Sequence, residues 1–138
     1  QPTSNVSWRS FDKRWRRLRL RALLEHLDEK RLLAELLRKS AVDDFEAVVA
    51  VRMLRDAGRS RDAITQAEQW IRALPRSSVL ADALFDLYSE DGWDEEALAL
   101  AVTHYGYDPN PAWIDKLGRL SLPAAKAQIK AWKKQLAA

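Results

Sequence analysis

The chain has 138 residues, of which 47% are hydrophobic and 31% charged, a balance typical of one globular domain over residues 1–138. It contains no apolar run of the ~18 residues that a membrane span needs, and no cysteine for disulfide bonds, thiolate catalysis or zinc binding. The lack of cysteine favours a reducing, cytoplasmic location. Because the chain starts at Gln1 rather than Met, we expect it to be part of a larger protein.

The net charge of +3 is unevenly distributed along the chain. Residues 1–39 carry a net charge of +6, residues 40–107 one of −7, and residues 108–138 one of +4. An acidic middle therefore lies between two basic ends. Such segregation can steer a charged partner, and it equally keeps a protein soluble.

The first predicted helix begins at Ser7, after residues 1–6, which we expect to fray. Its apolar residues have the three- and four-residue spacing of an amphipathic helix: Trp8, Phe11, Trp15, Leu18 and Ala22. The basic side chains between them are Arg9, Lys13, Arg14, Arg16, Arg17, Arg19 and Arg21. Two interpretations stay open: this face binds nucleic acid or another polyanion, or it is the solvated face of a capping helix.

A second helix is predicted over residues 29–39, and it completes an N-terminal hairpin over residues 7–39. Its apolar positions recur with helical spacing, as in the first helix. The residues expected on its buried side are Leu32, Leu33, Leu36 and Leu37.

The central region, residues 44–109, contains two copies of one sequence pattern. A 34-residue shift places residues 44–75 on residues 78–109 and gives five identities in 32 pairs. The identical pairs are Ala47 and Ala81, Gly58 and Gly92, Ala63 and Ala97, Ala67 and Ala101, and Pro75 and Pro109. A repeat of this length, built of two short helices, predicts a stacked helical array.

Each copy predicts two helices joined by a tight turn. In the first copy, Asp43 and Glu46 have the spacing of a capping box, Gly58 ends the first helix, and Ser60 caps the second. The corresponding residues of the second copy are Ser77 or Ser78 at the first cap, Gly92 at the turn and Asp94 at the second cap.

This pattern resembles a pair of tetratricopeptide repeats (TPR), with units at residues 44–77 and 78–111. The family's turn glycine is matched by Gly58 and Gly92, and its closing proline by Pro75 and Pro109. The resemblance implies an all-α, TPR-like, right-handed α-α superhelix of about eight antiparallel helices, with atypical end hairpins.

The units depart from the family in where large and small residues stand. Where the family has a small residue in the first helix, this chain has Val51 and Phe85. Where the family has an aromatic residue in the second helix, this chain has Ala67 and Ala101. Large and small positions are exchanged, which would conserve the packed volume.

In this family the first helices of successive units line a concave groove. The resemblance therefore implies a non-catalytic protein–protein interaction or scaffold module that binds a protein or peptide partner. The groove positions in this sequence are Phe45, Val48, Arg52, Arg55, Val79, Asp82, Asp86 and Ser89. A peptide with both charges and an apolar anchor would suit them. Alternatively, they are ordinary exposed charges beside apolar residues that the N-terminal hairpin covers.

Residues 110–138 are predicted to cap the array. Asn110 and Pro111 start a short helix, and residues 121–123 start a last helix that runs to Ala138. The inward residues are Trp113, Ile114 and Leu117 in the short helix, and Ile129, Trp132 and Leu136 in the last one. The lysines of its opposite face are Lys126, Lys130, Lys133 and Lys134.

We expect no enzyme, no metal site and no cofactor. The two histidines, His26 and His104, form no paired motif, and His104 falls at a packing position of a repeat helix. The acidic residues from Glu90 to Glu96 lack the alternating oxygen ligands of a calcium loop. Besides the interaction module, two functions stay open: a nucleic-acid or polyanion-binding module that uses the basic first helix, and a structural or oligomerisation domain. The partner's identity and the oligomeric state stay open as well.

Overall fold

The computed structural model describes residues 29–38 and 42–138, and in these residues it contains seven helices and no strand. The predicted all-α class is therefore confirmed for the described part of the chain. The predicted first helix, with its apolar seam, lies outside it. The seven helices are α2 (Glu29–Arg38), α3 (Asp44–Asp56), α4 (Ser60–Ala73), α5 (Ser78–Glu90), α6 (Asp94–Tyr107), α7 (Ala112–Leu117) and α8 (Pro123–Ala137).

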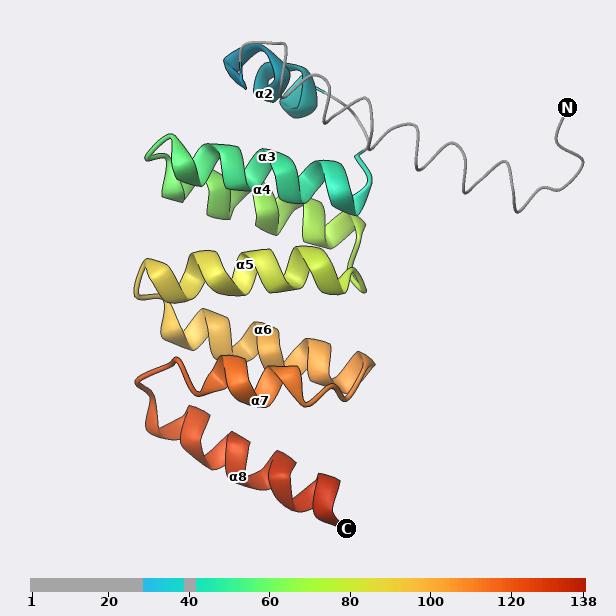
Figure 1. Cartoon of the computed structure of the whole chain (residues 1–138), viewed down its shortest axis with the longest axis vertical. Helices are drawn as coiled ribbons and strands as arrows, with labels where there is room; N and C mark the ends of the chain where they lie inside the picture. Colours follow the sequence, from blue (N-terminus) through green and yellow to red (C-terminus); the bar gives the residue numbers. More distant parts are fainter. Residues whose placement is uncertain (1–28, 39–41) are drawn as a thin grey trace, which may run out of the picture.

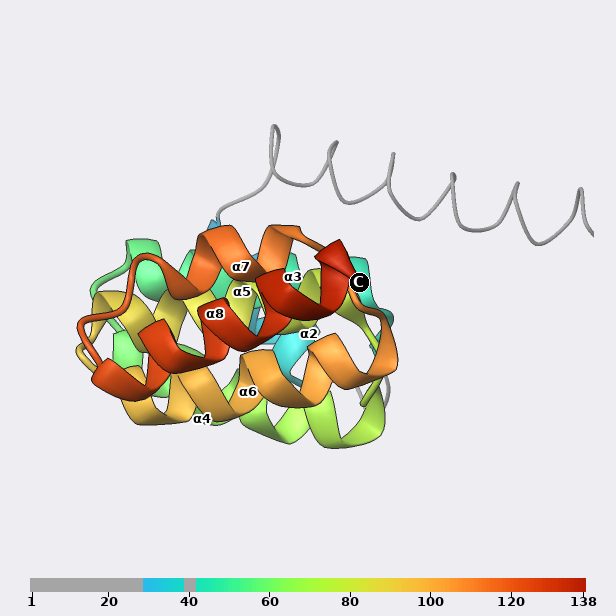
Figure 2. The ribbon, with the colours of Figure 1, turned by 90° about the horizontal axis from the view of Figure 1, so that it is seen from below.

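The helices stack one after another along the long axis of the molecule (Figure 1). Among the described helices, the main contacts join each helix to the next one along the chain or to the next but one, as α3 does with α4 and α5. Seen from below, α3 and α7 lie on one side of the stack, and α4 and α6 lie on the other (Figure 2). No described helix is long and apolar enough to cross a bilayer.

The helix boundaries repeat with the 34-residue spacing of the sequence. Helices α3 and α5 begin at Asp44 and Ser78 and have 13 residues each, and α4 and α6 begin at Ser60 and Asp94 and have 14 residues each. Helix α7 begins at Ala112, one further step of the same spacing, although it has only 6 residues. The spacing of helix starts therefore continues beyond residue 109, where the sequence similarity ends.

The first helices of both copies begin at side-chain caps, as predicted. The Asp43 carboxylate accepts a hydrogen bond from the Glu46 N–H (2.8 Å), and the Glu46 carboxylate accepts one from the Asp43 N–H (3.2 Å). These reciprocal bonds satisfy two N–H groups that have no partner inside the helix. At α5 the Ser77 hydroxyl accepts from the Leu80 N–H at 3.3 Å, so Ser77 rather than Ser78 is the cap.

Both predicted turn glycines have a backbone conformation that favours glycine. Gly58 has a φ of +78° and Gly92 one of +79°, in the left-handed region where a side chain would be strained. The residue after each glycine donates its N–H to a carbonyl near the end of the preceding helix, 2.9 Å from Leu54 O and 2.8 Å from Tyr88 O. Each turn thereby reverses the chain within two or three residues.

The predicted caps of the second helices are wrong by one residue. The N-cap residues are Arg59 and Trp93, and neither makes a side-chain capping bond. Because each glycine turn is so short, Ser60 and Asp94 already lie inside the helices. The Asp94 carboxylate instead accepts a hydrogen bond from the Ser121 N–H (3.2 Å), which ties the start of α6 to the segment before α8.

The exchanged large and small residues all lie in the core. Val51 and Phe85 are fully buried on the first helices, and so are Ala67 and Ala101 on the second helices. The large residues of α3 and α5 and the small residues of α4 and α6 thus belong to one core cluster. The predicted conservation of packed volume stays a prediction.

Aromatic contacts attach the last two helices. The rings of Tyr105 on α6 and Trp132 on α8 stack with centroids 4.0 Å apart, and Phe85 on α5 meets Trp113 on α7 edge to face at 6.0 Å. The predicted inward position of Leu136 is wrong, because its side chain is 49% exposed. Leu136 lies in the last turn of α8, where that helix has diverged from α7 (Figure 1).

Candidate functional site

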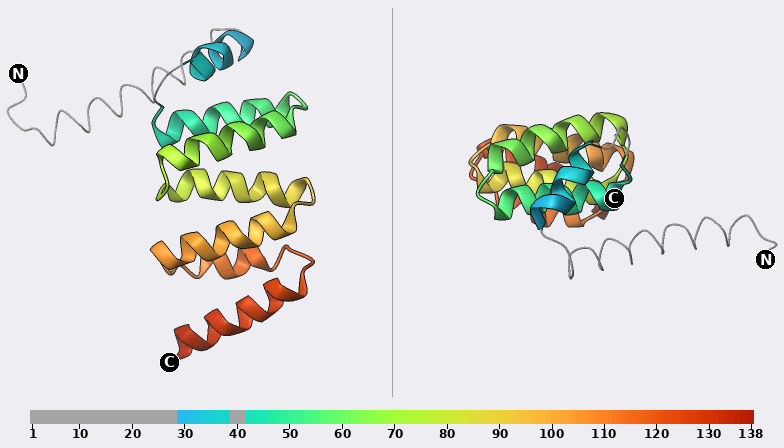
Figure 3. Two further views of the ribbon diagram at one scale, coloured as in Figure 1. Left: turned by 180° about the vertical axis from the view of Figure 1, so that it is seen from behind. Right: turned by 90° about the horizontal axis from the view of Figure 1, so that it is seen from above.

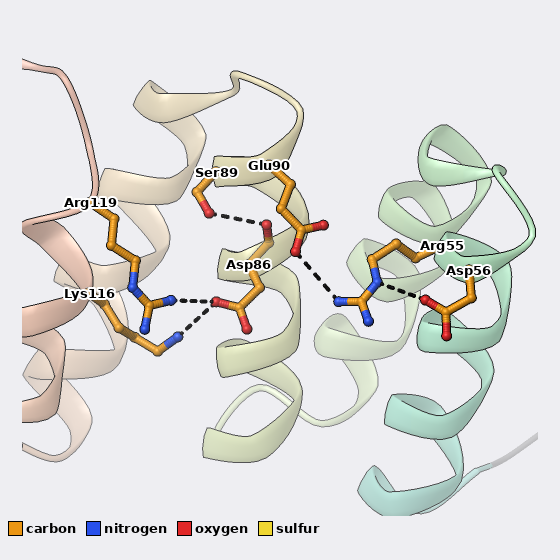
Figure 4. Close-up of polar contacts among 7 residues, drawn as sticks. All are labelled: Arg55, Asp56, Asp86, Ser89, Glu90, Lys116 and Arg119. Atoms are coloured by element: carbon orange, nitrogen blue, oxygen red, sulfur yellow. Dashed lines mark hydrogen bonds and ion pairs between the residues drawn. The ribbon is translucent and has the colours of Figure 1, made fainter.

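The eight residues predicted to line a groove all lie on α3 and α5. Val48 is buried, and Arg52 and Val79 are exposed. The half-buried members are Phe45, Arg55, Asp82, Asp86 and Ser89. Several of these side chains form ion pairs with residues of neighbouring helices, as Figure 4 shows for Arg55 and Asp86.

We use the name first-helix surface for the six charged side chains that α3, α5 and the α7 region bring together. They comprise Arg55 from α3, three carboxylates from α5, and two cations from α7 and the turn after it. The remaining members are Asp82, Asp86, Glu90, Lys116 and Arg119. Figure 4 shows all of them except Asp82.

The Asp86 carboxylate is the centre of this surface. Its Oδ1 atom accepts hydrogen bonds from Lys116 Nζ and from Arg119 Nη1, both at 3.1 Å. The Ser89 hydroxyl donates to the backbone carbonyl oxygen of Asp86 at 3.1 Å, so its hydrogen bond stays within α5. One α5 carboxylate thus holds two cations of the following unit.

Lys116 is the most buried charged side chain of the surface. Its Nζ atom forms ion pairs with both Asp82 and Asp86. It also lies 4.9 Å from the ring centroid of Phe85 and 5.8 Å from that of Trp113. A buried ammonium needs compensating charge and hydrogen bonds, and two carboxylates and two aromatic rings supply them here.

Helix α7 places Lys116 because its start is fixed. The Asn110 side chain accepts a hydrogen bond from the Ala112 N–H (3.0 Å). The N-cap residue is Pro111 and the helix begins at Ala112, so the predicted cap at Asn110 is wrong by one residue. Trp113 and Leu117, which were predicted to face inward, are both buried. Lys116 lies one helical turn from Trp113, and this spacing brings its ammonium to α5.

Arg55 connects α3 to α5. Its Nη1 atom lies 3.5 Å from Glu90 Oε1, and its Nε atom donates to the neighbouring Asp56 at 3.2 Å (Figure 4). The predicted groove positions include two cations on α3, Arg52 and Arg55, and two carboxylates on α5, Asp82 and Asp86. In the structure, Arg55 pairs with Glu90, whereas Asp82 and Asp86 pair with cations from the C-terminal side.

Sequence reasoning missed Lys116, Arg119 and Glu90 as members of the surface. A signal for Lys116 was present, because it lies one repeat spacing after Asp82 and so occupies the same position in the next unit. Extending the repeat beyond residue 109 would have placed a cation beside an acidic residue of α5. No comparable signal marks Arg119, which follows the end of the short α7.

His104 is a core residue, as predicted. Its side chain is only 5% exposed, and its ring meets the rings of Tyr107 (5.4 Å) and Trp113 (6.1 Å). Burial lowers the pKa of His104 below its ordinary value, so the ring is neutral near pH 7. Within residues 29–38 and 42–138, no group of three or more His, Cys, Asp or Glu side chains is arranged to hold a metal ion.

The predicted polyanion face, from Arg9 to Arg21, lies outside the described residues. Comparison of the chain with protein-family models, with curated proteins and with solved structures finds no match.

Proposed function

We propose that this chain is a non-catalytic protein–protein interaction module, built as a TPR-like, right-handed α-α superhelix with atypical ends. The supporting observation is that the first helices α3, α5 and α7 begin at Asp44, Ser78 and Ala112, which are evenly spaced along the chain. Their N-cap residues, Asp43, Ser77 and Pro111, occupy matching positions. Arrays of this kind bind partners along a surface formed by helices that lie side by side.

In this proposal the partner binds the first-helix surface together with Arg52 and Val79. Arg52 is exposed and forms no ion pair with the residues that the structure describes, and Val79 is 50% exposed. Glu90 and Arg119 are paired but keep more than half of their side chains in solvent. Exposed ion pairs are weak enough for charges of a partner to replace them. A peptide with charges of both signs and one apolar side chain fits this arrangement.

Two further parts of the proposal rest on the sequence. A cytoplasmic location is the compartment that the lack of cysteine favours, and a role as one module of a larger protein is part of the same proposal. Both stay predictions.

The test of the proposed surface is the substitution Arg52→Glu. Proteins captured by the wild-type chain are identified, and a purified candidate is then titrated against each variant. We expect about a tenfold loss of affinity, equivalent to ~1.4 kcal/mol. The melting temperature should stay unchanged, because Arg52 is exposed and unpaired among the described residues.

The matched control is Arg61→Glu, the same charge reversal at an exposed residue of α4 in the other layer. This variant should bind like the wild type. Equal losses in both variants would show that only net charge matters, and no loss with Arg52→Glu would remove the first-helix surface from the proposal.

A second candidate function is polyanion binding, for which α8 provides an observation. Four exposed lysines lie on α8, which has no acidic residue, and none of the four pairs with a carboxylate of the described residues. They are Lys126, Lys130, Lys133 and Lys134. Binding to double-stranded DNA through all four would give a slope of about −4 in log affinity against log salt. Absence of binding at low salt would exclude this function.

The third candidate, an oligomerisation domain, depends on the apolar seam between Trp8 and Trp15, which lies outside the described residues. Sedimentation of the full chain decides it, because a strict monomer at all concentrations has no homo-oligomeric seam.

A further inference from the structure

Helix α5 lies between α4 and α6 along the stack (Figure 3). Residues of these three helices line most of a hollow that shares no residue with the first-helix surface. Its volume is about 550 Å³, within the range of about 300–1,000 Å³ found for ligand sites. The floor consists of side chains that are nearly buried, Leu84, Tyr88 and His104. Half-buried Ile71 and Leu100 form its walls, so the hollow is largely apolar.

A second hollow of about 520 Å³ adjoins the first along α6. Glu96 lines both hollows. In addition, Tyr88 of the first hollow stacks on Trp93 of the second, with ring centroids 6.1 Å apart and planes at 13°. We call the two hollows together the α6 groove.

Carboxylates outnumber cations in the α6 groove. Glu68 and Glu96 line the first hollow, Asp94 and Glu95 line the second with Glu96, and Arg72 is the one cation among the lining residues. None of Glu68, Glu95 and Glu96 forms an ion pair with a described cation. The groove therefore carries a net negative charge beside an apolar floor.

Tyr88 is affected by this negative charge. Its hydroxyl donates a hydrogen bond to Glu68 Oε2 at 2.6 Å. Burial raises the pKa of Tyr88 well above its ordinary value, and the hydrogen bond to Glu68 and the charges of Glu68 and Glu96 raise it further. Because neutral His104 adds no positive charge to the floor, the groove favours a cationic ligand.

Exposed aromatic rings add a second feature that suits cations. Trp93 is 36% exposed and Tyr107 is 45% exposed, although both are large side chains that favour burial. The Arg76 guanidinium of this chain lies 4.9 Å from the centroid of the Tyr107 ring and already covers one face of it, so Trp93 is the ring that is left for a cation of the ligand.

We propose that the α6 groove binds a basic peptide segment of a partner protein. An apolar side chain of the peptide occupies the floor between α4 and α6, while Arg or Lys side chains lie beside Glu68 and Glu96 and against the exposed Trp93 ring. The binding site lies apart from the first-helix surface, so it adds a second partner site to the molecule.

Binding is tested with the full chain and a fluorescein-labelled short peptide in which one Leu is flanked by pairs of Arg. Fluorescence anisotropy should show saturable binding. Replacing every Arg by Glu should abolish it, and replacing the Leu by Ser should weaken it. Equal binding of all three peptides would overturn the proposal, because neither charge nor the apolar anchor would then contribute.

Ala99→Arg is the variant that locates the peptide. Ala99 lines the first hollow and is exposed, so Arg fills the hollow and adds positive charge without disturbing the core. The matched control is Ala127→Arg at an exposed position of α8 that lines neither hollow. We expect Ala99→Arg to weaken peptide binding at least tenfold, and Ala127→Arg to leave it unchanged.

The charge contribution is tested with Glu96→Gln. One partly exposed charge pair corresponds to a two- to fivefold loss of affinity, and the loss should shrink at high salt. Circular dichroism melting of each variant checks that the fold is retained. Unchanged binding in both Ala99→Arg and Glu96→Gln would overturn the proposal even if the peptide binds.

Two other occupants give distinct results. If the chain self-associates and Ala99→Arg abolishes this association, the groove holds a second copy rather than a partner. A set of unrelated basic peptides is compared with a peptide that has the sequence of residues 7–22. If only the latter binds, the occupant of the groove is this chain's own basic segment. Either result overturns the proposal. Loss of peptide binding in Arg52→Glu alone would also overturn it, because the peptide would then bind the first-helix surface.

Discussion

The ammonium group of Lys116 has three N–H donors in a place where little water reaches it. Only 10% of its side chain is exposed, compared with 45% for Asp82 and 28% for Asp86. The two carboxylates stand one helical turn apart on α5 and repel each other when no cation lies between them. Lys116 therefore stabilises α5 as well as the attachment of α7 to it.

We predict that Lys116→Met lowers the free energy of unfolding by about 1–3 kcal/mol. Methionine keeps most of the volume between the rings of Phe85 and Trp113, so the loss reports the charge. Removing one partner of a fully buried pair costs about 3–5 kcal/mol, and the water that reaches Asp82 reduces this figure. Urea denaturation provides the measurement.

The control for this prediction is Lys130→Met on the exposed face of α8, which should change stability by less than about 0.5 kcal/mol. A loss of similar size in both variants would mean that the pairs of Lys116 with Asp82 and Asp86 contribute nothing specific. Neither substitution changes Arg119, which also pairs with Asp86 at 3.1 Å, so the comparison reports the contribution of Lys116 alone.

Local signals determine the helices, and this is why the sequence predicts them. The capping box at Asp43 and the turn glycines Gly58 and Gly92 depend on residues within one or two turns of each other. The caps of α4 and α6 were misplaced by one residue, because the exact length of a glycine turn depends on backbone dihedral angles. The sequence alone does not specify these angles.

The glycines of this chain allow a matched comparison between a turn and a helix. We predict that Gly92→Ala lowers the free energy of unfolding by about 1–2 kcal/mol, because alanine is strained at a φ of +79°. In contrast, Gly106→Ala in the last turn of α6 should raise it by up to about 0.5 kcal/mol, because glycine is a weaker helix former than alanine.

Steric clashes do not complicate this comparison. A Cβ atom would meet nothing within 4 Å at either position, so the two substitutions differ in backbone conformation alone. The measurement is thermal or urea denaturation of both variants. Effects of the same sign would contradict the assignment of Gly92 to a left-handed turn.

The two candidate sites were not equally predictable from the sequence. The eight predicted residues do lie on the first helices, since a 34-residue shift identifies equivalent helix positions. The ion-pair partners of Asp82 and Asp86 come from the α7 region, where the sequence repeat is no longer recognisable. Lys116 lies on α7, which has about half the length of α5, so the sequence contains little indication of this contact. No sequence pattern indicated the α6 groove, because its shape depends on how α4 and α6 pack against α5.

In a stack where each helix contacts only helices near it along the chain, a destabilising substitution should unfold the helices around it and leave distant helices folded. We predict that Trp132→Ala, which removes the stacking partner of Tyr105, lowers amide hydrogen-exchange protection in α7 and α8. Protection in α3 and α4 should stay the same. Leu136→Ala is the control, because Leu136 is largely exposed and its truncation should leave α8 protected. A uniform loss of protection in all helices would show that the array unfolds as one cooperative unit.

The hydrogen bond between Ser77 and Asp44 has an electrostatic consequence for the whole stack. Its donor is the Ser77 hydroxyl, and its acceptor is Asp44 Oδ2, 3.2 Å away. Helices α3 and α5 therefore begin at the same edge, and their macrodipoles point the same way, so their partially positive ends repel each other. The first turn of α5 contains no acidic residue. The Ser77 hydroxyl holds the Asp44 carboxylate beside the start of α5, where its negative charge offsets part of the positive end of that helix dipole and so favours the parallel alignment of the two units.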